Sequence, residues 1–384
     1  MEGLSTRGHL PESEHHNVGM LRTIYITSAL VALTSALTPA HASGGIVYSG
    51  RYYNPPGVKA TSQYHIYTID PDGKHKRQLT SGVDADQVPR WSPDGKHIAF
   101  LRYSSETYVA KLCVMTASGA SLRILGTDNA DALLWIDDDH VAIPNEVGYR
   151  SFDIRDGSSS VHPKTRSRVA SPDGRYTLRF DANGAVVLDK AGHTTALDTA
   201  VAGPYDYSPD RLIWQNDTTL TYLTPGSEAV NADPKLDDAA YALLGFDGQV
   251  KKTLHFNVVR QGFGNNYPGM GSFERVQPFV ADPKFFIAVE NWHNSTVGTD
   301  LGYYKVEAAT GKTKFLREGQ FIVWSPSGQQ FCISPGRDTT DYEKRKDGTW
   351  RLVWTSPLSV VDARTNGAHQ ITPRLSSVTS ADWR

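Results

Sequence analysis

The sequence predicts an all-β fold, a seven-bladed β-propeller with four-stranded antiparallel blades. Three observations lead to this fold class. The 384 residues include 33 Gly, 21 Pro, 18 Tyr and 8 Trp, a composition typical of many turns between aromatic strands. Two kinds of hairpin signal each recur seven times along the chain. The two ends of the chain carry single strands that have no hairpin partner nearby.

The first kind of hairpin joins two apolar strands through a turn of two to four residues. In "PRWSPDGKHIAFLRY" (89–103), a strand meets Ser-Pro-Asp-Gly and a second strand follows in period-two alternation. The same signal covers 132–145, 167–180, 205–216, 277–291 and 320–334, and it ends in the unpaired strand "SVTSADWR" (377–384). We expect each of these hairpins to form the two innermost strands of a blade.

The second kind of hairpin lies between the first ones and turns through Asp-Gly, Asn-Gly or Ala-Gly. Glycine supplies the positive φ that a tight hairpin turn requires. These hairpins cover 66–80, 112–125, 151–162, 185–197, 242–256, 303–316 and 359–373. Two hairpins make a four-stranded repeat, and seven repeats make seven blades. The motifs at 132–145 and 205–216 are eroded, so six and eight blades stay open.

The ends of the predicted domain, residues 43–384, complement each other. The strand "GGIVYSG" (44–50) precedes the first Asp-Gly hairpin, and the last strand lacks a successor. Pairing these two strands would complete one blade from both termini. We therefore predict a ring that is closed without an open sheet edge.

A targeting segment precedes this domain. Residues 20–42 contain Arg22, an apolar stretch and the small-x-small site that ends at Ala42, which is the pattern of a signal peptide. The stretch is too short and too rich in Ser and Thr to favour a membrane span, and a buried helix is the alternative. Residues 1–19 are a polar extension, untranslated if synthesis starts at Met20. We expect cleavage after Ala42 and a periplasmic or secreted protein without a membrane span.

Three stretches resemble a known repeat family. The runs "WSPDGKHIAF" (91–100), "IYTIDPDGKHKRQLT" (66–80) and the closing "QIT…ADWR" resemble the WD40-like repeats of TolB-type propellers. The resemblance covers nearly all of 43–384 and implies a propeller that binds a protein partner. TolB carries a further domain before its propeller, and prolyl-oligopeptidase relatives carry a hydrolase after theirs. We expect a stand-alone propeller here.

Strand order places the connections of a blade on two faces. The tight turns share one face, and the long segments 51–65, 224–240, 257–277, 291–302 and 335–354 fall on the other, which we call the long-loop face. Long loops that a compact domain could omit are usually functional. We therefore expect the long-loop face to bind the ligand.

Aromatic and arginine side chains, which often anchor interfaces, mark this face. The predicted ligand-binding residues are Arg51, Tyr52, Tyr53, Arg260, Phe263, Tyr267, Glu290, Trp292, His293, Arg337, Tyr342 and Trp350. For each aromatic residue, the alternative is that it fixes its loop to the scaffold.

The function predicted from these features is non-catalytic binding of a protein or peptide by a monomer. The alternative is a lyase or hydrolase acting on an oligosaccharide in the central channel, where His65, His255 and His293 could converge. The sequence has no G-x-S-x-G elbow, H-E-x-x-H or paired C-x-x-C motif, so we predict no catalytic residue, metal site or cofactor. The net charge of −2 does not favour nucleic-acid binding.

The two cysteines, Cys113 and Cys332, lie in apolar runs that read as strands. One disulfide between them is possible. We expect two separate core residues instead.

Overall fold

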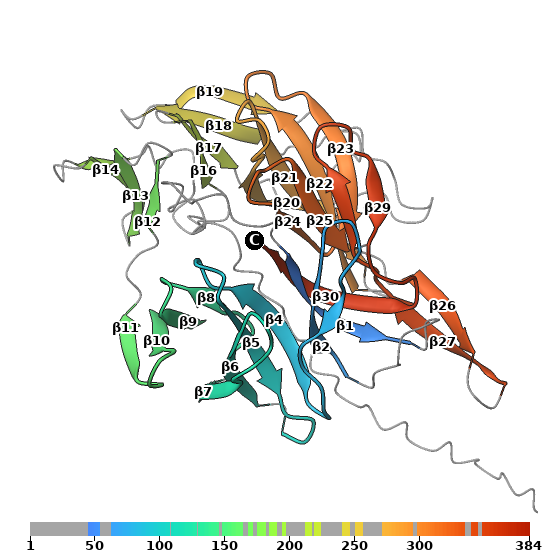
Figure 1. Cartoon of the computed structure of the whole chain (residues 1–384). Coiled ribbons are helices and arrows are strands. Elements are labelled where there is room, and N and C mark those ends of the chain that lie inside the picture. The colour runs from blue at the N-terminus through green and yellow to red at the C-terminus, as the bar shows by residue number, and fades with distance from the viewer. Residues whose placement is uncertain are drawn as a thin grey trace, which may run out of the picture.

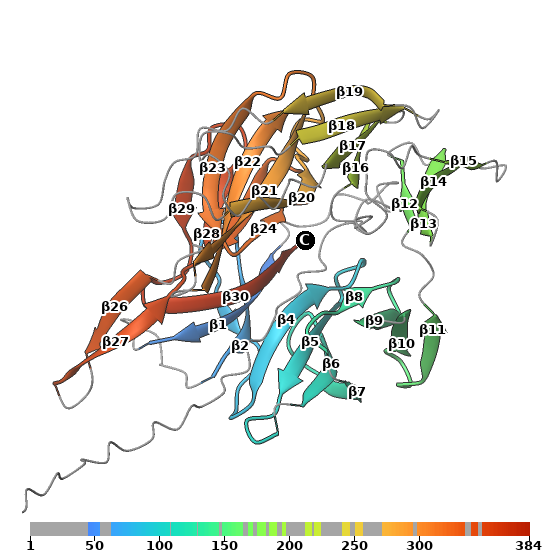
Figure 2. The ribbon, with the colours of Figure 1, turned by 180° about the vertical axis from the view of Figure 1, so that it is seen from behind.

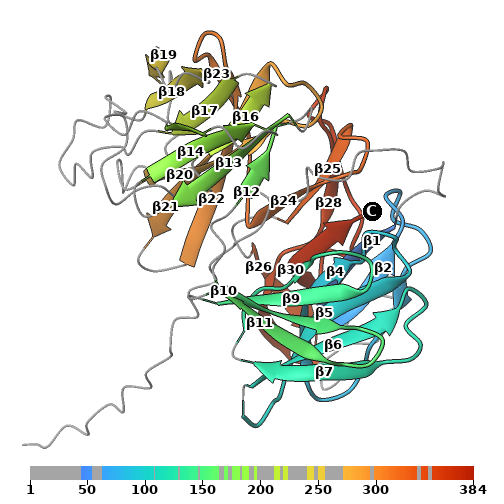
Figure 3. The same cartoon turned by 90° about the vertical axis from the view of Figure 1, so that its left-hand side faces the viewer.

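The described part of the chain is built from β-strands, and its four-stranded sheets are arranged around a centre close to the C-terminus (Figures 1 and 2). Figure 3 shows the same strands from the side. The computed structural model describes residues 45–53, 63–107, 109–128, 130–145, 148–163, 168–171, 175–181, 184–189, 194–196, 212–216, 219–223, 240–245, 250–255, 271–294, 298–334, 339–344 and 348–384. Among these residues, no helix is long and apolar enough to cross a lipid bilayer. The predicted signal peptide lies outside them.

In the described ranges, the strands form seven four-stranded antiparallel sheets and one two-stranded hairpin. The sheets of the N-terminal half are β4 (Ala85–Trp91), β5 (His97–Tyr103), β6 (Ala110–Thr116), β7 (Arg123–Asp128); β8 (Leu134–Trp135), β9 (His140–Asn145), β10 (Gly148–Asp153), β11 (Ser159–Pro163); and β12 (Arg168–Ala170), β13 (Tyr176–Asp181), β14 (Gly184–Asp189), β15 (Thr194–Ala196). Each sheet follows the order of its strands in the chain.

The C-terminal half repeats this arrangement. Its sheets are β16 (Leu212–Asn216), β17 (Thr219–Leu223), β18 (Ala240–Gly245), β19 (Val250–His255); β20 (Gly271–Pro278), β21 (Phe285–Asn294), β22 (Gly298–Glu307), β23 (Thr313–Gly319); and β24 (Phe321–Trp324), β25 (Gln330–Ser334), β28 (Ser359–Asp362), β29 (Ala368–Gln370). The hairpin β26 (Thr339–Lys344) and β27 (Trp350–Thr355) is inserted between β25 and β28.

The remaining sheet joins the two ends of the described chain. Its order is β3 (Arg77–Gln78), β2 (His65–Ile69), β1 (Ile46–Tyr52) and β30 (Ser376–Trp383). The first and last strands pair antiparallel, with Ile46 opposite Trp383 and Tyr48 opposite Ala381. The side chains of this sheet that face the β24–β29 sheet are apolar and buried, and they form one core cluster with Phe321, Leu358 and Val360. Burial of apolar surface therefore stabilises this terminal pairing.

The Ser-Pro-Asp-Gly turn links β4 to β5, as its sequence predicts. The Asp94 carboxylate accepts hydrogen bonds from the Ser92 hydroxyl at 2.7 Å and from the backbone N–H of Lys96 at 3.0 Å. Gly95 adopts a φ of 63°, which is in the left-handed region that favours glycine. The turn residues thus meet the local hydrogen-bonding and backbone requirements of the hairpin.

A recurring tryptophan connects neighbouring sheets. The indole N–H of Trp91, on β4, donates to the carbonyl oxygen of Gly45, just before β1, at 3.1 Å. One repeat later, the indole N–H of Trp135 donates to the carbonyl oxygen of Arg90, on β4, at 3.1 Å. The equivalent positions of these two repeats therefore make equivalent contacts to the preceding sheet.

Of the hairpin predicted over 205–216, the structure describes residues 212–216, which form β16 and pair with β17; residues 205–211 lie outside the described chain. Two expectations about long loops need correction. The loop predicted over 291–302 is mostly strand, since β21 and β22 extend through Asn294 and from Gly298. The segment 335–354 contains the inserted hairpin, which projects from the body in Figures 1 and 2.

Candidate functional site

The candidate residues near β1 belong mainly to the scaffold. Tyr52 and Tyr53 are buried, and the Tyr52 hydroxyl lies 2.5 Å from the hydroxyl of Tyr48. The Tyr52 ring also meets the Tyr67 ring edge to face, at a centroid distance of 5.0 Å. Burial raises the pKa of Tyr52 well above its ordinary value, so this hydroxyl stays neutral. Tyr52 and Tyr53, which were predicted to contact a ligand, are therefore packed inside the protein in this structure.

Tyr53 connects β1 to the inserted hairpin. The guanidinium groups of Arg51 and Arg351 lie over the Tyr53 ring, at 5.0 Å and 5.9 Å from its centroid. Arg351 also forms an ion pair with the buried carboxylate of Glu343, with an N–O distance of 2.5 Å. These contacts fix the inner face of the hairpin, because Glu343 and Arg351 are directly opposite each other on β26 and β27.

The outer face of the same hairpin is apolar and exposed. Tyr342 is opposite Leu352 and Lys344 is opposite Trp350, so all four side chains share one face of the two-stranded sheet. The exposed fractions are 61% for Tyr342, 63% for Trp350 and 49% for Leu352. Tyr342 and Trp350 are the two aromatic residues among the exposed large hydrophobic residues of the described chain. We call Tyr342, Lys344, Trp350 and Leu352 the hairpin face.

The other candidate residues lie in β21 or outside the described chain. Glu290, Trp292 and His293 belong to β21, where they are opposite Gly302, Asp300 and Thr299 of β22. They were predicted on a loop, and the structure places them on a strand. Four further candidates lie outside the described residues, namely Arg260, Phe263, Tyr267 and Arg337.

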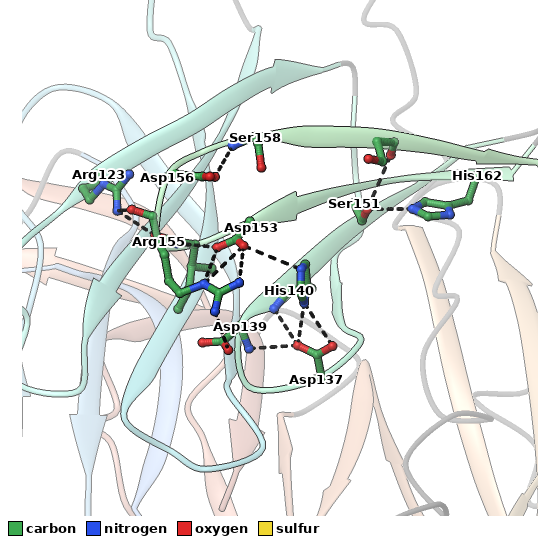
Figure 4. A network of polar contacts seen from close by, with 12 residues as sticks. Arg123, Asp137, Asp139, His140, Ser151, Asp153, Arg155, Asp156, Ser158 and His162 are labelled. Carbon is green, nitrogen blue, oxygen red and sulfur yellow. Dashed lines mark hydrogen bonds and ion pairs between the residues drawn. The ribbon is translucent and has the colours of Figure 1, made fainter.

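A polar pocket lies on the β8–β11 sheet (Figure 4). Because side chains alternate along a strand, Tyr149, Ser151 and Asp153 share one face of β10. Antiparallel pairing puts His162 opposite Tyr149 and Ser160 opposite Ser151 on β11. All five residues line the pocket, which has a volume of about 270 Å³.

Two of these side chains form a hydrogen-bonded pair. The Ser151 hydroxyl lies 2.8 Å from Nε2 of His162. The His162 ring stacks on the Tyr149 ring, with a centroid distance of 4.6 Å and an interplanar angle of 14°. The stack and the hydrogen bond together fix the orientation of the imidazole at the pocket wall.

His140 and the acidic residues complete the pocket wall. Nδ1 of His140 lies 2.9 Å from the Asp137 carboxylate, and Nε2 lies 3.7 Å from that of Asp153 (Figure 4). The Arg155 guanidinium also binds Asp153 at 2.5 Å, and this hydrogen bond holds the pKa of Asp153 well below its ordinary value. The same hydrogen bond to Asp153 in turn raises the pKa of Arg155. Both groups are charged at neutral pH, and each neutralises the other.

This pocket was not predicted from the sequence. A signal was nevertheless present in "GYRSFD" (148–153). The equivalent strand β6 contributes buried apolar residues to both faces, such as Leu112 and Cys113, whereas one face of β10 is polar. A polar face on an inner strand of a stacked sheet is unexpected unless its side chains have another role.

Of the three histidines predicted at the channel, His65 is the one whose side chain the structure describes. His65 is buried at the start of β2, where Nδ1 lies 3.8 Å from the Asp86 carboxylate. Asp86 also accepts hydrogen bonds from Nε and Nη2 of Arg102, at 2.6 Å and 3.0 Å. His65 therefore lies beside the buried Asp86–Arg102 ion pair. The side chains of His255 and His293 lie outside what the structure describes.

The described residues contain no group of three or more His, Cys, Asp or Glu side chains that could hold a metal ion. Cys113 and Cys332 are free and buried, as expected from the sequence. Burial raises the pKa of Cys113 to about 12 and also raises the pKa of Cys332. Both thiols are therefore protonated, unreactive core residues.

Comparison with known proteins finds similarity at low sequence identity. No family model matches the chain. The lasso peptide isopeptidase AtxE2 of Asticcacaulis excentricus is 28% identical over 126 residues, which cover 30% of this chain and 18% of that protein. The chain therefore spans less than a fifth of the length of this curated relative.

Two solved structures are similar over most of the chain. TolB from Acinetobacter baumannii is 17% identical, with coverage of 90% of this chain and 67% of TolB, and a TM-score of 0.38. The β-propeller domain of the trilobed protease from Pyrococcus furiosus is 11% identical, with coverage of 86% and 92%, and a TM-score of 0.42.

Proposed function

We propose that the chain is a non-catalytic β-propeller that binds a protein or peptide on its long-loop face. The hairpin face carries this proposal. Its inner side is fixed by the Glu343–Arg351 ion pair, while Tyr342, Trp350 and Leu352 remain exposed on the outer side. Clustered aromatic residues on a fixed support are typical of interface hot spots, since few rotatable bonds are immobilised when a partner binds.

The proposed architecture is a ring of seven blades closed by β1 and β30. Seven four-stranded sheets and the pairing of the terminal strands support it. Deletion of residues 380–384 should remove the partner of Ile46, Val47 and Tyr48, expose the adjacent core, and lower the melting temperature strongly. A melting temperature close to that of the intact protein would contradict closure by these strands.

The proposed ligand is a polypeptide. The partial similarity to a protein named as a lasso peptide isopeptidase favours a peptide over a sugar for the long-loop face. We further propose that the chain is cleaved after Ala42 and acts as a monomer in the periplasm or outside the cell. Mass spectrometry of the exported protein tests the cleavage site, and light scattering tests the oligomeric state.

Selection of random twelve-residue peptides on the mature protein tests the binding face. We expect enriched peptides that bind the wild type and lose at least about tenfold in affinity on Trp350→Ala, since hot-spot truncations cost 2 kcal/mol or more. The matched control is Val161→Ala, which truncates an exposed hydrophobic residue on β11. Equal binding by both variants, or no enrichment, would refute the proposed face.

The same peptides separate binding from catalysis. The alternative function is a lyase or hydrolase that acts on an oligosaccharide in the central channel. Cleavage of an enriched peptide by the purified chain would replace the non-catalytic part of the proposal but would keep the binding face. Cleavage of oligosaccharides without peptide binding would favour the alternative.

A further inference from the structure

One face of β10 is polar, and the other face is apolar. On the opposite face of this strand, Phe152 is buried in a core cluster with Leu101, Leu125 and Val141. Tyr149, Ser151 and Asp153 instead line the pocket. This pocket is formed by β9, β10, β11 and the turn before β9, so it is separate from the inserted hairpin in both sequence and sheet.

The carboxylates of the pocket wall are already engaged by neighbouring side chains. Asp153 is bound by Arg155 at 2.5 Å and faces His140 at 3.7 Å, while Asp137 is bound by His140 at 2.9 Å. An anionic ligand would approach two carboxylates, which repel it. A cationic ligand would have to displace Arg155 or His140 from these carboxylates. The arrangement therefore favours a neutral ligand.

The remaining lining groups suit a ligand with many hydroxyl groups. Ser151, Ser158 and Ser160 offer hydroxyls that donate and accept hydrogen bonds, and the imidazoles of His140 and His162 add further polar atoms. Ile136 is the aliphatic residue of the lining, so an apolar ligand would find little apolar surface. The chemistry of the wall thus matches a polyhydroxylated compound.

The stacked rings of Tyr149 and His162 add a flat surface to these polar groups. An aromatic ring presents a negative face, which packs favourably against the C–H groups of a pyranose. The volume of about 270 Å³ is near the lower limit for small-molecule sites and is suited to a ligand of roughly one sugar ring. We propose that this pocket is a binding site for one hexose unit of a neutral saccharide, held against the Tyr149–His162 pair.

Nuclear magnetic resonance of the full chain with ¹³C-labelled histidine rings tests this site. The probes are glucose, galactose, mannose and N-acetylglucosamine, each added to about 10 mM, enough to detect millimolar affinity. We expect at least one sugar to shift the ring signals of His140 and His162, assigned with His140→Gln and His162→Gln. Glucuronate, which has a carboxylate on a similar ring, should bind at least about tenfold more weakly if repulsion by the carboxylates operates.

Two variants relate any binding to the proposed contacts. Tyr149→Phe should keep the affinity within about twofold because the ring stack remains, whereas Tyr149→Ala should weaken it at least about tenfold. His75→Gln, at an exposed turn bonded to Asp70, is the control for histidine replacement. Absence of shifts with every neutral sugar, equal binding of glucuronate, or unchanged affinity of a folded Tyr149→Ala would each overturn the proposal. None of these outcomes affects the peptide-binding proposal.

Discussion

The C-terminal residue should couple energetically to the first Ser-Pro-Asp-Gly turn. The Arg384 guanidinium donates hydrogen bonds to the carbonyl oxygens of Gly95 and Asp94, at 2.9 Å and 2.8 Å. A Cβ atom added to Gly95 would lie 1.7 Å from Cζ of Arg384, so the guanidinium would have to leave its place. The same position has a φ of 63°, which is unfavourable for alanine.

The structure gives the expected size of each effect. Arg384→Ala loses two charge-assisted hydrogen bonds at a half-buried site, which we take as about 2 kcal/mol in total. Gly95→Ala adds about 1 kcal/mol of backbone strain and also displaces Arg384, so we expect about 3 kcal/mol. In the double variant there is no guanidinium to displace, and the loss should again be about 3 kcal/mol, not the additive value of about 5 kcal/mol.

Urea denaturation of the wild type, both single variants and the double variant measures this coupling. We expect the four free energies of unfolding to give an interaction of about 2 kcal/mol. Additivity within about 0.5 kcal/mol would refute the reasoning, since it would mean that Arg384 does not occupy the space above Gly95.

Three further predictions concern buried groups. The Asp382 carboxylate accepts a hydrogen bond from the backbone N–H of Trp91 at 2.7 Å, and burial raises the pKa of Asp382. Ionisation of Asp382 therefore lowers the stability of the folded protein as the pH rises above the ordinary pKa of an aspartate. Asp382→Asn keeps the acceptor and should raise the urea midpoint at pH 7 more than at pH 3, and a lower midpoint at pH 7 would contradict this. For Asp86, burial alone would raise the pKa, but the contacts with His65 and Arg102 outweigh burial and lower the pKa. The stabilising effect of the Asp86 carboxylate is therefore present at neutral pH and is lost as the pH falls below the ordinary range. Asp86→Asn leaves Arg102 unpaired beside a buried site, so it should lower the free energy of unfolding in urea by about 3 kcal/mol at pH 7 and by less at pH 3. An equal loss at both pH values would rule out the Asp86–Arg102 ion pair as the source of this stability. Cys113 and Cys332 should resist a thiol-specific reagent at pH 8 and both react in urea, whereas rapid labelling of the native protein would exclude their burial.

The sequence predicted the fold class because its signals are local. Ser92, Asp94 and Gly95 satisfy the turn within four residues, so the hairpin β4–β5 can be read without any tertiary information. The pairing of β16 with β17 was not predicted, because the strand 219–223 follows β16 without a glycine-containing turn signal in the sequence.

The candidate sites were harder to predict, because exposure is not encoded locally. Tyr52 and Trp350 are both aromatic residues in segments that were expected on the long-loop face. Tyr52 is buried against Tyr48 and Tyr67, whereas Trp350 is on the outer side of an inserted hairpin. Strand alternation assigns two faces to each strand, but only the neighbouring sheet decides which face is covered.

By itself, the sequence determined that this chain forms four-stranded antiparallel sheets, with their tight turns and their apolar strands, because these depend on backbone conformation and period-two patterning. Only the tertiary structure decided which of the aromatic residues belong to the core, that the hairpin face stays exposed, and that His140, Ser151, Asp153 and His162 meet in one pocket. Those outcomes depend on strand register and on packing between sheets, which bring together residues that are distant along the chain.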